Sequence, residues 1–237
     1  MTARLALVTG FEPYGGRGRN PAGEVAARLD GMEIAGARVV GRSLPVAFGP
    51  LRQSIPAMLA EVDPAAVIGL GLCPGEAVIR LERVAINLAD FDIPDNDGLV
   101  LVDREVDAGG MAARFATLPL RAIQDALLQA GIPARLSSSA GTYLCNQALY
   151  HFLGAIEQGG RTARCGFLHL PYVPEQVAGM VAEIQAARSV ERHRRTDIPS
   201  MRLELMVEAV RIALEVTLAQ AKTGERAALG DTGIDRS

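Results

Sequence analysis

The sequence predicts an α/β fold: one domain with an open, twisted, mostly parallel sheet, helices on both faces in three α/β/α layers, and a β-hairpin arm. Short runs of strand-forming residues alternate with amphipathic helical patterns along most of the chain. Ala65–Gly71 is continuously apolar, which is typical of a central parallel strand buried on both faces. With 237 residues the chain is long enough to enclose one large core. We therefore expect one domain over residues 1–222 and a flexible C-terminal tail over residues 223–237.

Glycine, proline and polar clusters divide the chain into its expected elements. The expected strands are Leu5–Thr9, Arg38–Leu44, Ala65–Gly71, Val78–Leu88, Ala134–Ser138 and Arg164–Leu170, and Leu99–Val106 supplies the hairpin arm. The expected helices are Pro21–Leu29 with Asn20 as its N-cap, Leu51–Glu61, Leu120–Gln129, one that begins near Cys145, and Pro199–Lys222. Pro56 marks a kink or a boundary in the second of these helices.

The composition excludes several classes of protein. The formal net charge is −3 with acids and bases interspersed, so neither a nucleic-acid surface nor a basic membrane-binding face is expected. No apolar stretch approaches the roughly 18 residues that span a bilayer, and Met1–Gly10 is predicted to be a first strand and not a signal peptide. Three cysteines without a CxxC pair indicate neither a disulfide framework nor a zinc site. We expect a cytoplasmic protein that needs no metal or cofactor.

Ser137–Tyr150 is the segment most indicative of chemistry. Small and hydroxyl residues lead through Gly141 into Cys145, which opens a helical pattern. A cysteine in the first turn of a helix lies near unpaired backbone N–H groups that favour the thiolate, and a thiolate attacks carbonyl carbons. The alternative is a small, inert, buried cysteine. Cys73, in a Gly/Pro turn, is a second candidate nucleophile, but it lacks a helix start and the small-residue lead.

A base for this cysteine is expected from another segment of the chain. His169 lies near the carboxyl end of an apolar strand, and in open α/β sheets ligands bind outside the carboxyl ends of strands. His151 falls on a different helical face from the cysteine, and His193 lies in a polar, charged run. His169 is therefore the best base candidate, with a structural histidine as the alternative.

Glu82 is an isolated carboxylate in an apolar strand. Cysteine, histidine and a carboxylate from separate segments are the set that a thiol hydrolase needs, because the carboxylate orients the imidazole and stabilises its charged form. The alternative is a surface ion pair, since Arg80 and Arg83 flank the glutamate.

The first expected strand ends in a glycine-rich loop that contains two aromatic residues, Phe11 and Tyr14. Aromatic side chains on a loop beyond a strand end can form the wall of an apolar pocket, or they can simply cover the edge of the sheet. A nucleotide-binding α/β protein is a further hypothesis, but the loop matches neither GxGxxG nor GxxxxGK[ST].

Six motifs follow one another between Leu7 and Leu218. They are TGFEPYGG (Thr9–Gly16), NP (Asn20–Pro21), ERVAIN (Glu82–Asn87), IPDN (Ile93–Asn96), AGTYLCN (Ala140–Asn146) and FLHLPYVPEQ (Phe167–Gln176). In these motifs the chain resembles the pyroglutamyl peptidase I family of cysteine peptidases. The resemblance implies substrates that are peptides with an N-terminal pyroglutamate, catalysis without a metal or organic cofactor, and a homodimer or homotetramer.

The resemblance also implies residue roles. The family's Cys–His–Glu triad falls on Cys145, His169 and Glu82, the set already indicated by chemistry. Its pocket for the pyroglutamyl lactam ring falls on Phe11, Tyr14, Val46, Ile93, Tyr143 and Leu144, with Asn20 as a polar contact to the lactam.

The chain departs from the family pattern at several positions. Tyr14 stands where most members have Phe, and Val46 where they have Thr or another small residue. Leu72–Glu76 stands where many bacterial relatives read Gln-Ala-Gly-Gly-Arg, so Glu76 reverses a charge and is expected to change the pairing near Glu82. Val177–Ile198 is longer and more charged than usual. Two further hypotheses are therefore a thiol hydrolase of another small cyclic amide or ester, and a catalytically silent protein that binds pyroglutamyl peptides.

Overall fold

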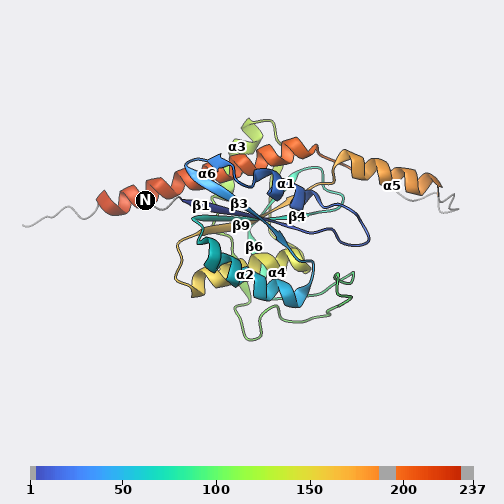
Figure 1. Ribbon diagram of the computed structural model, residues 1–237, viewed down its shortest axis with the longest axis horizontal. Helices are drawn as coiled ribbons and strands as arrows, with labels where there is room; N and C mark the ends of the chain where they lie inside the picture. Colours follow the sequence, from blue (N-terminus) through green and yellow to red (C-terminus); the bar gives the residue numbers. More distant parts are fainter. Residues whose placement is uncertain (1–3, 187–195, 231–237) are drawn as a thin grey trace, which may run out of the picture.

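The computed structural model describes residues 4–186 and 196–230 (Figure 1). Its main sheet has seven strands in the order β2-β3-β1-β4-β9-β5-β8. These strands are β1 (Leu5–Phe11), β2 (Glu33–Ile34), β3 (Ala37–Leu44), β4 (Ala66–Leu72), β5 (Ile79–Glu82), β8 (Ala134–Ser137) and β9 (Arg164–Leu170). All neighbouring strands are parallel except the pairs β2–β3 and β5–β9. The predicted mostly parallel sheet is confirmed, and β4 is buried along its whole length as expected for a central strand.

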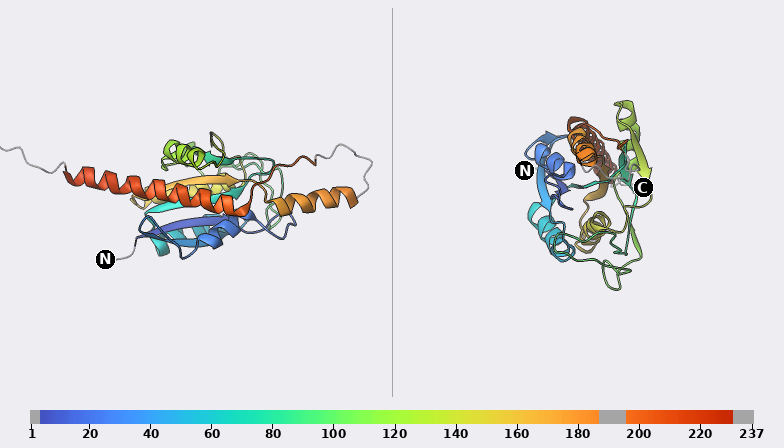
Figure 2. Two further views of the ribbon diagram at one scale, coloured as in Figure 1. Left: turned by 90° about the horizontal axis from the view of Figure 1, so that it is seen from above. Right: turned by 90° about the vertical axis from the view of Figure 1, so that its right-hand side faces the viewer.

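Helices cover both faces of the sheet (Figure 1). They are α1 (Pro21–Leu29), α2 (Phe48–Val62), α3 (Leu120–Gln129), α4 (Leu144–Gln158), α5 (Pro174–Ala186) and α6 (Leu203–Gly230). One apolar core lies between the sheet and α1, α3 and α6, and a second lies between the sheet and α2 and α4. The three-layer arrangement is therefore confirmed. α5 extends beyond the end of the sheet (Figure 2).

The helix boundaries differ from the predicted ones where sequence signals compete. α1 begins as predicted, because the Asn20 side chain accepts a hydrogen bond from the Ala22 N–H at 3.1 Å. α2 is continuous through Pro56, so no boundary forms there. α5 lies largely within the segment noted for its length, and residues 187–195 of that segment lie outside the described residues.

α6 continues to Gly230, eight residues beyond residue 222, where the domain was predicted to end. The helix continues past Gly224 because Glu225–Leu229 contains no proline and consists of good helix formers. The rest of the predicted tail, residues 231–237, lies outside the described residues. Within residues 4–186 and 196–230, no helix combines the length and the apolar character needed to cross a bilayer.

The predicted hairpin arm was placed on the wrong residues. Leu99–Val106 contains no strand, and its only bridge joins Arg104 to Ala89. The antiparallel ribbon is formed instead by β6 (Val84–Ile86) and β7 (Ala113–Phe115), on either side of this loop. Asp95 explains the irregular loop, because its carboxylate accepts hydrogen bonds from the N–H groups of Asp97 and Leu99 and holds the backbone in a turn.

The strand expected over Val78–Leu88 divides at Arg83 into β5 and β6. β5 belongs to the main sheet, where it runs antiparallel to β9, so that Arg80 lies opposite His169 and Glu82 opposite Phe167. Residues that oppose each other in an antiparallel pair point to the same face of the sheet. These four side chains therefore share the face on which Phe167 packs into the α2/α4 core.

Candidate active site

Cys145 lies in the first turn of α4, as the sequence predicts. The preceding loop turns at Gly141, whose φ of 79° is in the left-handed region that glycine adopts without strain. Asn146, the next residue of the helix, accepts a hydrogen bond from the Ile86 N–H at 2.9 Å and donates one to the Ile86 carbonyl at 2.8 Å. The start of α4 is thereby fixed to β6, and Cys145 is held with it.

The Cys145 sulfur packs against the backbone of β4 at Gly71. A Cβ atom placed on Gly71 would lie 2.6 Å from Cys145 Sγ and 2.9 Å from the Phe167 ring, closer than real Cβ atoms approach. Only glycine at position 71 therefore leaves room for the Cys145 sulfur. Gly71 is also the register partner of His169 in the β4–β9 pair, so the sulfur lies beside the strand neighbour of the histidine.

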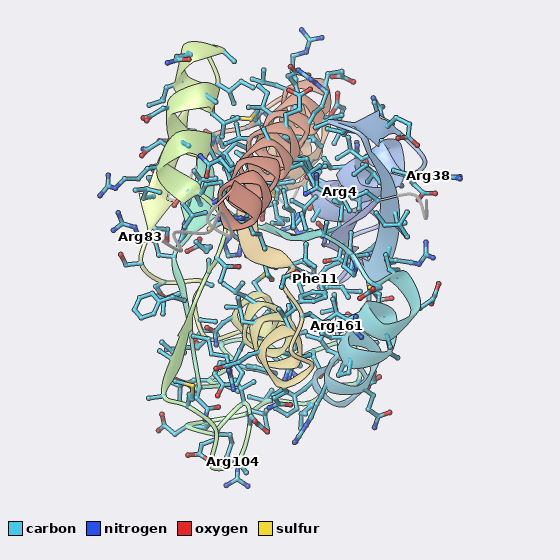
Figure 3. The ribbon with its side chains drawn as sticks, turned by 90° about the vertical axis from the view of Figure 1, so that its left-hand side faces the viewer. Arg4, Phe11, Arg38, Arg83, Arg104 and Arg161 are labelled. Atoms are coloured by element: carbon cyan, nitrogen blue, oxygen red, sulfur yellow. The ribbon has the colours of Figure 1, made fainter. Side chains whose placement is uncertain are left out.

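His169 and Glu82 form a buried pair. The His169 Nδ1 donates to Glu82 Oε1 at 2.8 Å, and Glu82 is 0% exposed. With its Nδ1 bound to the carboxylate, the neutral imidazole has its Nε2 free to accept a proton. Of the two flanking arginines, Arg83 points outward (Figure 3), whereas the Arg80 Nε lies 3.1 Å from Glu82 Oε1. The surface ion pair considered from the sequence is wrong, because the carboxylate is buried.

Cys145 and His169 line one cavity of about 460 Å³. The residues that the family resemblance assigns to the lactam pocket line this same cavity: Phe11, Tyr14, Asn20, Val46, Ile93, Tyr143 and Leu144. Phe11 is buried and lies near the middle of the view in Figure 3. The structure thus brings together all nine cavity-lining candidates, from segments far apart in the sequence, with Glu82 directly behind the imidazole.

Aromatic rings form one wall of the cavity. The rings of Tyr14 and Tyr143 lie 6.5 Å apart, and Phe91, outside the cavity, supports Tyr143 edge-on at 4.7 Å. The Tyr143 hydroxyl donates to the Pro94 carbonyl at 3.1 Å. Burial raises the pKa of Tyr143 to about 12 and raises the pKa of Tyr14 as well, so both phenols are neutral near pH 7 and the wall has no charge.

Asn20 lines the cavity but already has structural partners. Its side-chain oxygen caps α1, and its Nδ2 donates to the Glu12 carbonyl at 3.0 Å. A carboxamide has two N–H donors, so one donor has no hydrogen bond within the described part of the chain. This donor is the part of Asn20 that can contact a ligand.

The prediction that Cys145 favours the thiolate is wrong for this environment. A backbone hydrogen bond and the Arg80 charge lower the pKa of the thiol, but burial raises it more, and Cys73 and Glu82 raise it further. The desolvation of a charged sulfur therefore outweighs the helix N-terminus. Burial therefore favours the neutral thiol over the thiolate at Cys145.

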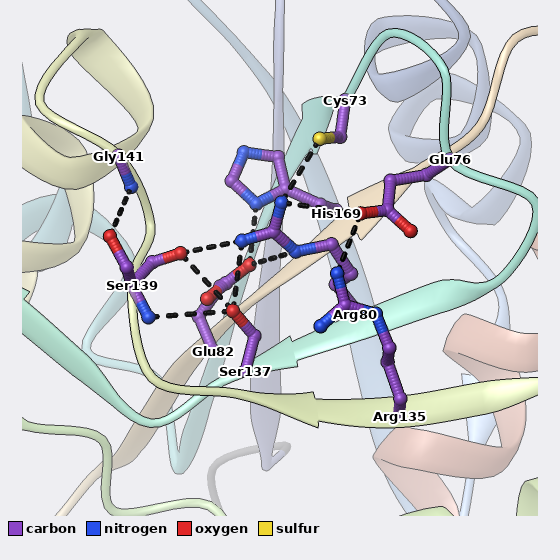
Figure 4. A network of polar contacts seen from close by, with 9 residues as sticks. All are labelled: Cys73, Glu76, Arg80, Glu82, Arg135, Ser137, Ser139, Gly141 and His169. Carbon is purple, nitrogen blue, oxygen red and sulfur yellow. Dashed lines mark hydrogen bonds and ion pairs between the residues drawn. The ribbon is translucent and has the colours of Figure 1, made fainter.

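Arg80 is the site residue that the sequence interpretation missed. Its Nη1 donates to Cys73 Sγ at 3.2 Å, and its Nη2 donates to Ser137 Oγ at 2.8 Å and to the Ser139 carbonyl at 2.6 Å (Figure 4). Arg80 and Glu82 are two residues apart on one strand and therefore share a face. That spacing was the available signal, and it pairs the two side chains once the strand is known to be buried.

Glu76 joins this network from the loop between β4 and β5. Its carboxylate lies 2.6 Å from the Arg135 Nη2 and 3.5 Å from the Arg80 Nη1 (Figure 4). The acidic residue at position 76 therefore pairs with two arginines, one of which contacts Glu82. Glu76 thus takes part in the pairing near Glu82 through Arg80.

Of the other two histidines, one lies in a separate cavity and the other is not among the described residues. His151 lines a separate cavity with Arg52 and Asp107, and burial lowers its pKa to about 4. His193 lies outside the described residues. Among residues 4–186 and 196–230 no group of three or more His, Cys, Asp or Glu side chains is arranged to hold a metal ion.

Comparison with known proteins identifies the family. The family model described as pyroglutamyl peptidase matches residues 4–220. This chain belongs to the pyroglutamyl peptidase family. It is 41% identical over 214 residues to a pyrrolidone-carboxylate peptidase of Pyrococcus furiosus, which covers 90% of this chain and 98% of the relative. A pyrrolidone-carboxylate peptidase 1 of Ralstonia nicotianae is 42% identical over 212 residues, 90% of this chain and 92% of the relative.

Solved structures of the pyroglutamyl peptidase family have the same fold. The pyrrolidone carboxyl peptidase of Thermococcus litoralis superposes with a TM-score of 0.84 at 38% identity, covering 93% of this chain and 96% of that one. The similarity spans nearly the whole of both chains, so this chain has the complete fold of that relative.

Gly71→Ala tests the packing of the nucleophile. The added methyl group displaces the Cys145 sulfur, and overpacking of this kind costs about 1–3 kcal/mol. We expect turnover of a pyroglutamyl reporter amide to fall at least about tenfold, since small misplacements of reacting groups have large kinetic effects. Turnover of the folded variant is compared with wild type after its circular dichroism and melting temperature have been checked.

Gly49→Ala is the matched control, because a Cβ at Gly49 in α2 meets nothing within 4 Å. We expect this variant to keep wild-type turnover and stability. A Gly71→Ala enzyme as active as wild type would contradict the packing argument.

The raised pKa of Cys145 predicts the pH dependence of its alkylation. A thiol with a raised pKa gains thiolate only as the pH rises through that pKa, so alkylation by iodoacetamide should still accelerate above about pH 9. The rate is followed at the Cys145 peptide by mass spectrometry, which separates it from Cys73 and Cys165. A rate that levels off below about pH 7 would instead indicate a preformed thiolate–imidazolium pair.

Proposed function

We propose that this enzyme hydrolyses the amide bond after an N-terminal pyroglutamyl residue of peptides, with Cys145 as nucleophile, His169 as base and Glu82 as the carboxylate that orients it. The observation that supports this most strongly is the shared cavity: a thiol and a carboxylate-bound imidazole line one apolar pocket. Membership of the pyroglutamyl peptidase family supports the same reaction.

Proton transfer accompanies the attack. In the proposed attack, His169 Nε2 removes the thiol proton of Cys145 as the sulfur bonds to the pyroglutamyl carbonyl carbon. The imidazolium then gives this proton to the departing amine, the carbon–nitrogen bond breaks, and a thioester remains. Water, deprotonated by the same imidazole, releases free pyroglutamate and restores the thiol.

Glu82 stabilises the imidazolium that forms in both steps. Its hydrogen bond to Nδ1 fixes the tautomer that leaves Nε2 free, and its negative charge favours the protonated ring. The backbone N–H groups at the start of α4 are the donors for the oxyanion, since Tyr143 at the N-cap provides no side-chain hydrogen bond to them. Loss of one such donor typically costs about 3–4 kcal/mol of the barrier.

The mostly apolar cavity, which Asp90 and Asp92 also line, is the proposed source of selectivity. A pyroglutamyl ring has no charged amine, whereas an ordinary N-terminal ammonium would lose its hydration against Phe11, Tyr14 and Tyr143 at a cost of several kcal/mol. The remaining N–H of Asn20 is the polar contact for the lactam. The substrates are therefore peptides whose first residue is pyroglutamate.

A hydrolase of another small cyclic amide is the second candidate, favoured by one observation. Tyr14 and Val46 stand in the cavity where the family usually has Phe and a smaller residue, and both contribute to its shape. A catalytically silent, peptide-binding protein is disfavoured, because the Glu82–His169 hydrogen bond needed for catalysis is formed.

Replacement of each cavity cysteine tests the nucleophile. Cys145→Ser should abolish release of the reporter amine from a pyroglutamyl amide while the melting temperature is kept, because serine at this position lacks a reactive thiolate. Cys73→Ser is the matched control, since Cys73 lines the same cavity, and it should keep much of the activity.

The same assay with prolyl, plain aminoacyl and other lactam amides separates the two candidate functions. Preference for the pyroglutamyl amide supports the first, and a stronger reaction with another cyclic amide supports the second. Turnover by Cys145→Ser, or complete loss in Cys73→Ser, would overturn the nucleophile assignment.

We further propose a homodimer or homotetramer in a reducing cytoplasm. Ile93, Leu99, Val100 and Val102 expose apolar side chains on one loop, which supports an assembly that covers them. All three cysteines are unpaired, which supports the compartment. Light scattering after gel filtration should give a mass of two or four chains, and a monomer at micromolar concentration would contradict the assembly.

A further inference from the structure

Arg80 connects three parts of the site that lie far apart in the sequence. Its side chain is 16% exposed and extends from β5, the strand that also supplies Glu82. One end of the guanidinium contacts the Glu82 carboxylate and the other contacts Cys73, Ser137 and Ser139 (Figure 4). Ser137 and Ser139 begin the loop that leads to Cys145, so the arginine lies between the carboxylate and the nucleophile's loop.

Glu82 needs a cation to remain charged. It is 0% exposed, its Oε1 is shared between His169 and Arg80, and its Oε2 has no hydrogen-bond partner among the described residues. A buried carboxylate with so few hydrogen bonds is neutralised unless an opposite charge is nearby. A neutral Glu82 would hold the ring in place but would not stabilise the imidazolium.

We propose that Arg80 is a positioning residue for the hydrolysis, which supplies the cation beside the buried Glu82 carboxylate and holds the Ser137–Ser139 loop that leads to Cys145. The inference rests on the proposed function, since it assigns a role within that reaction. Arg80 touches neither the substrate nor the reacting atoms in this role.

The geometry of a guanidinium suits both tasks. Its Nε lies toward Glu82 while its Nη2 donates to Ser139 at 2.6 Å on the other side. A lysine ammonium is a single point and does not reach both partners at once. The two tasks can therefore be separated by replacing Arg80 with lysine, which keeps the charge, and with methionine, which removes it.

Arg135 is the matched control. It lies beside Arg80 in the register of β5 and β8, and it contacts Glu76 at 2.6 Å. No contact joins it to Glu82 or His169 within the described chain. Arg135→Met therefore removes one cation from the same network without removing a contact of the Glu82–His169 pair.

Several charged and titratable groups surround the Glu82–His169 pair. They are Arg80 on β5, Cys73 and Glu76 on the loop after β4, Cys145 on α4 and Arg135 on β8. Loss of the Arg80 cation makes protonation of the pair easier, whereas the other groups are unchanged. The acid limb of the pH profile must then move to higher pH.

The experiment compares the four proteins in steady-state turnover of a pyroglutamyl amide between about pH 5 and pH 9. Arg80→Met should lower kcat at least about tenfold with little change in KM, and should move the acid limb of kcat/KM up by about half a unit or more. Arg80→Lys should keep the wild-type acid limb but retain a lowered kcat. Arg135→Met should match wild type in both.

A merely structural arginine gives a different pattern. In Arg80→Met such a structural role would lower only the amount of folded enzyme. The pH profile would be unchanged, and so would kcat per active site, with active sites counted by stoichiometric alkylation. That result overturns the proposal. If Arg80→Met does not fold, Arg80→Lys decides, because wild-type kcat in that variant excludes the loop-holding role.

Failure of the proposed function is recognised separately. It appears as absence of turnover by the wild-type enzyme. Alkylation of Cys145 then replaces the assay, since the charge of Arg80 lowers the pKa of this thiol. Arg80→Met should shift the alkylation profile to higher pH, and an unchanged profile overturns the inference without reference to any substrate.

Discussion

The antiparallel pairing of β5 with β9 is the constraint on which the site depends. Because the strands run in opposite directions, Glu82 at the carboxyl end of β5 lies opposite Phe167, two residues before His169. The carboxylate is therefore deeper in the sheet than the imidazole, behind it as seen from the cavity, and fully buried. A parallel pairing would direct the carboxyl end of β5 toward the same edge as that of β9, where solvent would reach the carboxylate.

The two acidic groups of the site, Glu82 and Cys145, differ in the partners that surround them. Glu82 has a cation and a hydrogen-bond donor, and these compensate the loss of water. For the Cys145 thiolate the loss of water is not compensated to the same extent, and burial raises the pKa of the thiol. In the proposed mechanism His169 removes the Cys145 proton, and the hydrogen bond of its Nδ1 to Glu82 Oε1 leaves Nε2 free to accept that proton.

The sequence predicted the layers, the central strand and the cysteine at a helix start, because these depend on local signals: the apolar run Ala65–Gly71, and the glycine before Cys145. It did not predict that β5 runs antiparallel, since strand direction depends on distant partners. It placed the hairpin arm wrongly, because Asp95 organises the Leu99 loop through its side chain. The family motifs identified the cavity residues, which their spacing along the sequence did not by itself connect.

The charge reversal at position 76 illustrates why Arg80 escaped a residue-by-residue interpretation. An added carboxylate near a buried glutamate would by itself oppose the ionisation of Glu82. In the structure Glu76 lies between Arg80 and Arg135, which supply two positive charges to balance the two carboxylates. The balance involves three segments, so no single position reveals it. Arg80 contacts both Glu76 and Glu82, whereas Arg135 contacts only Glu76 of these two carboxylates.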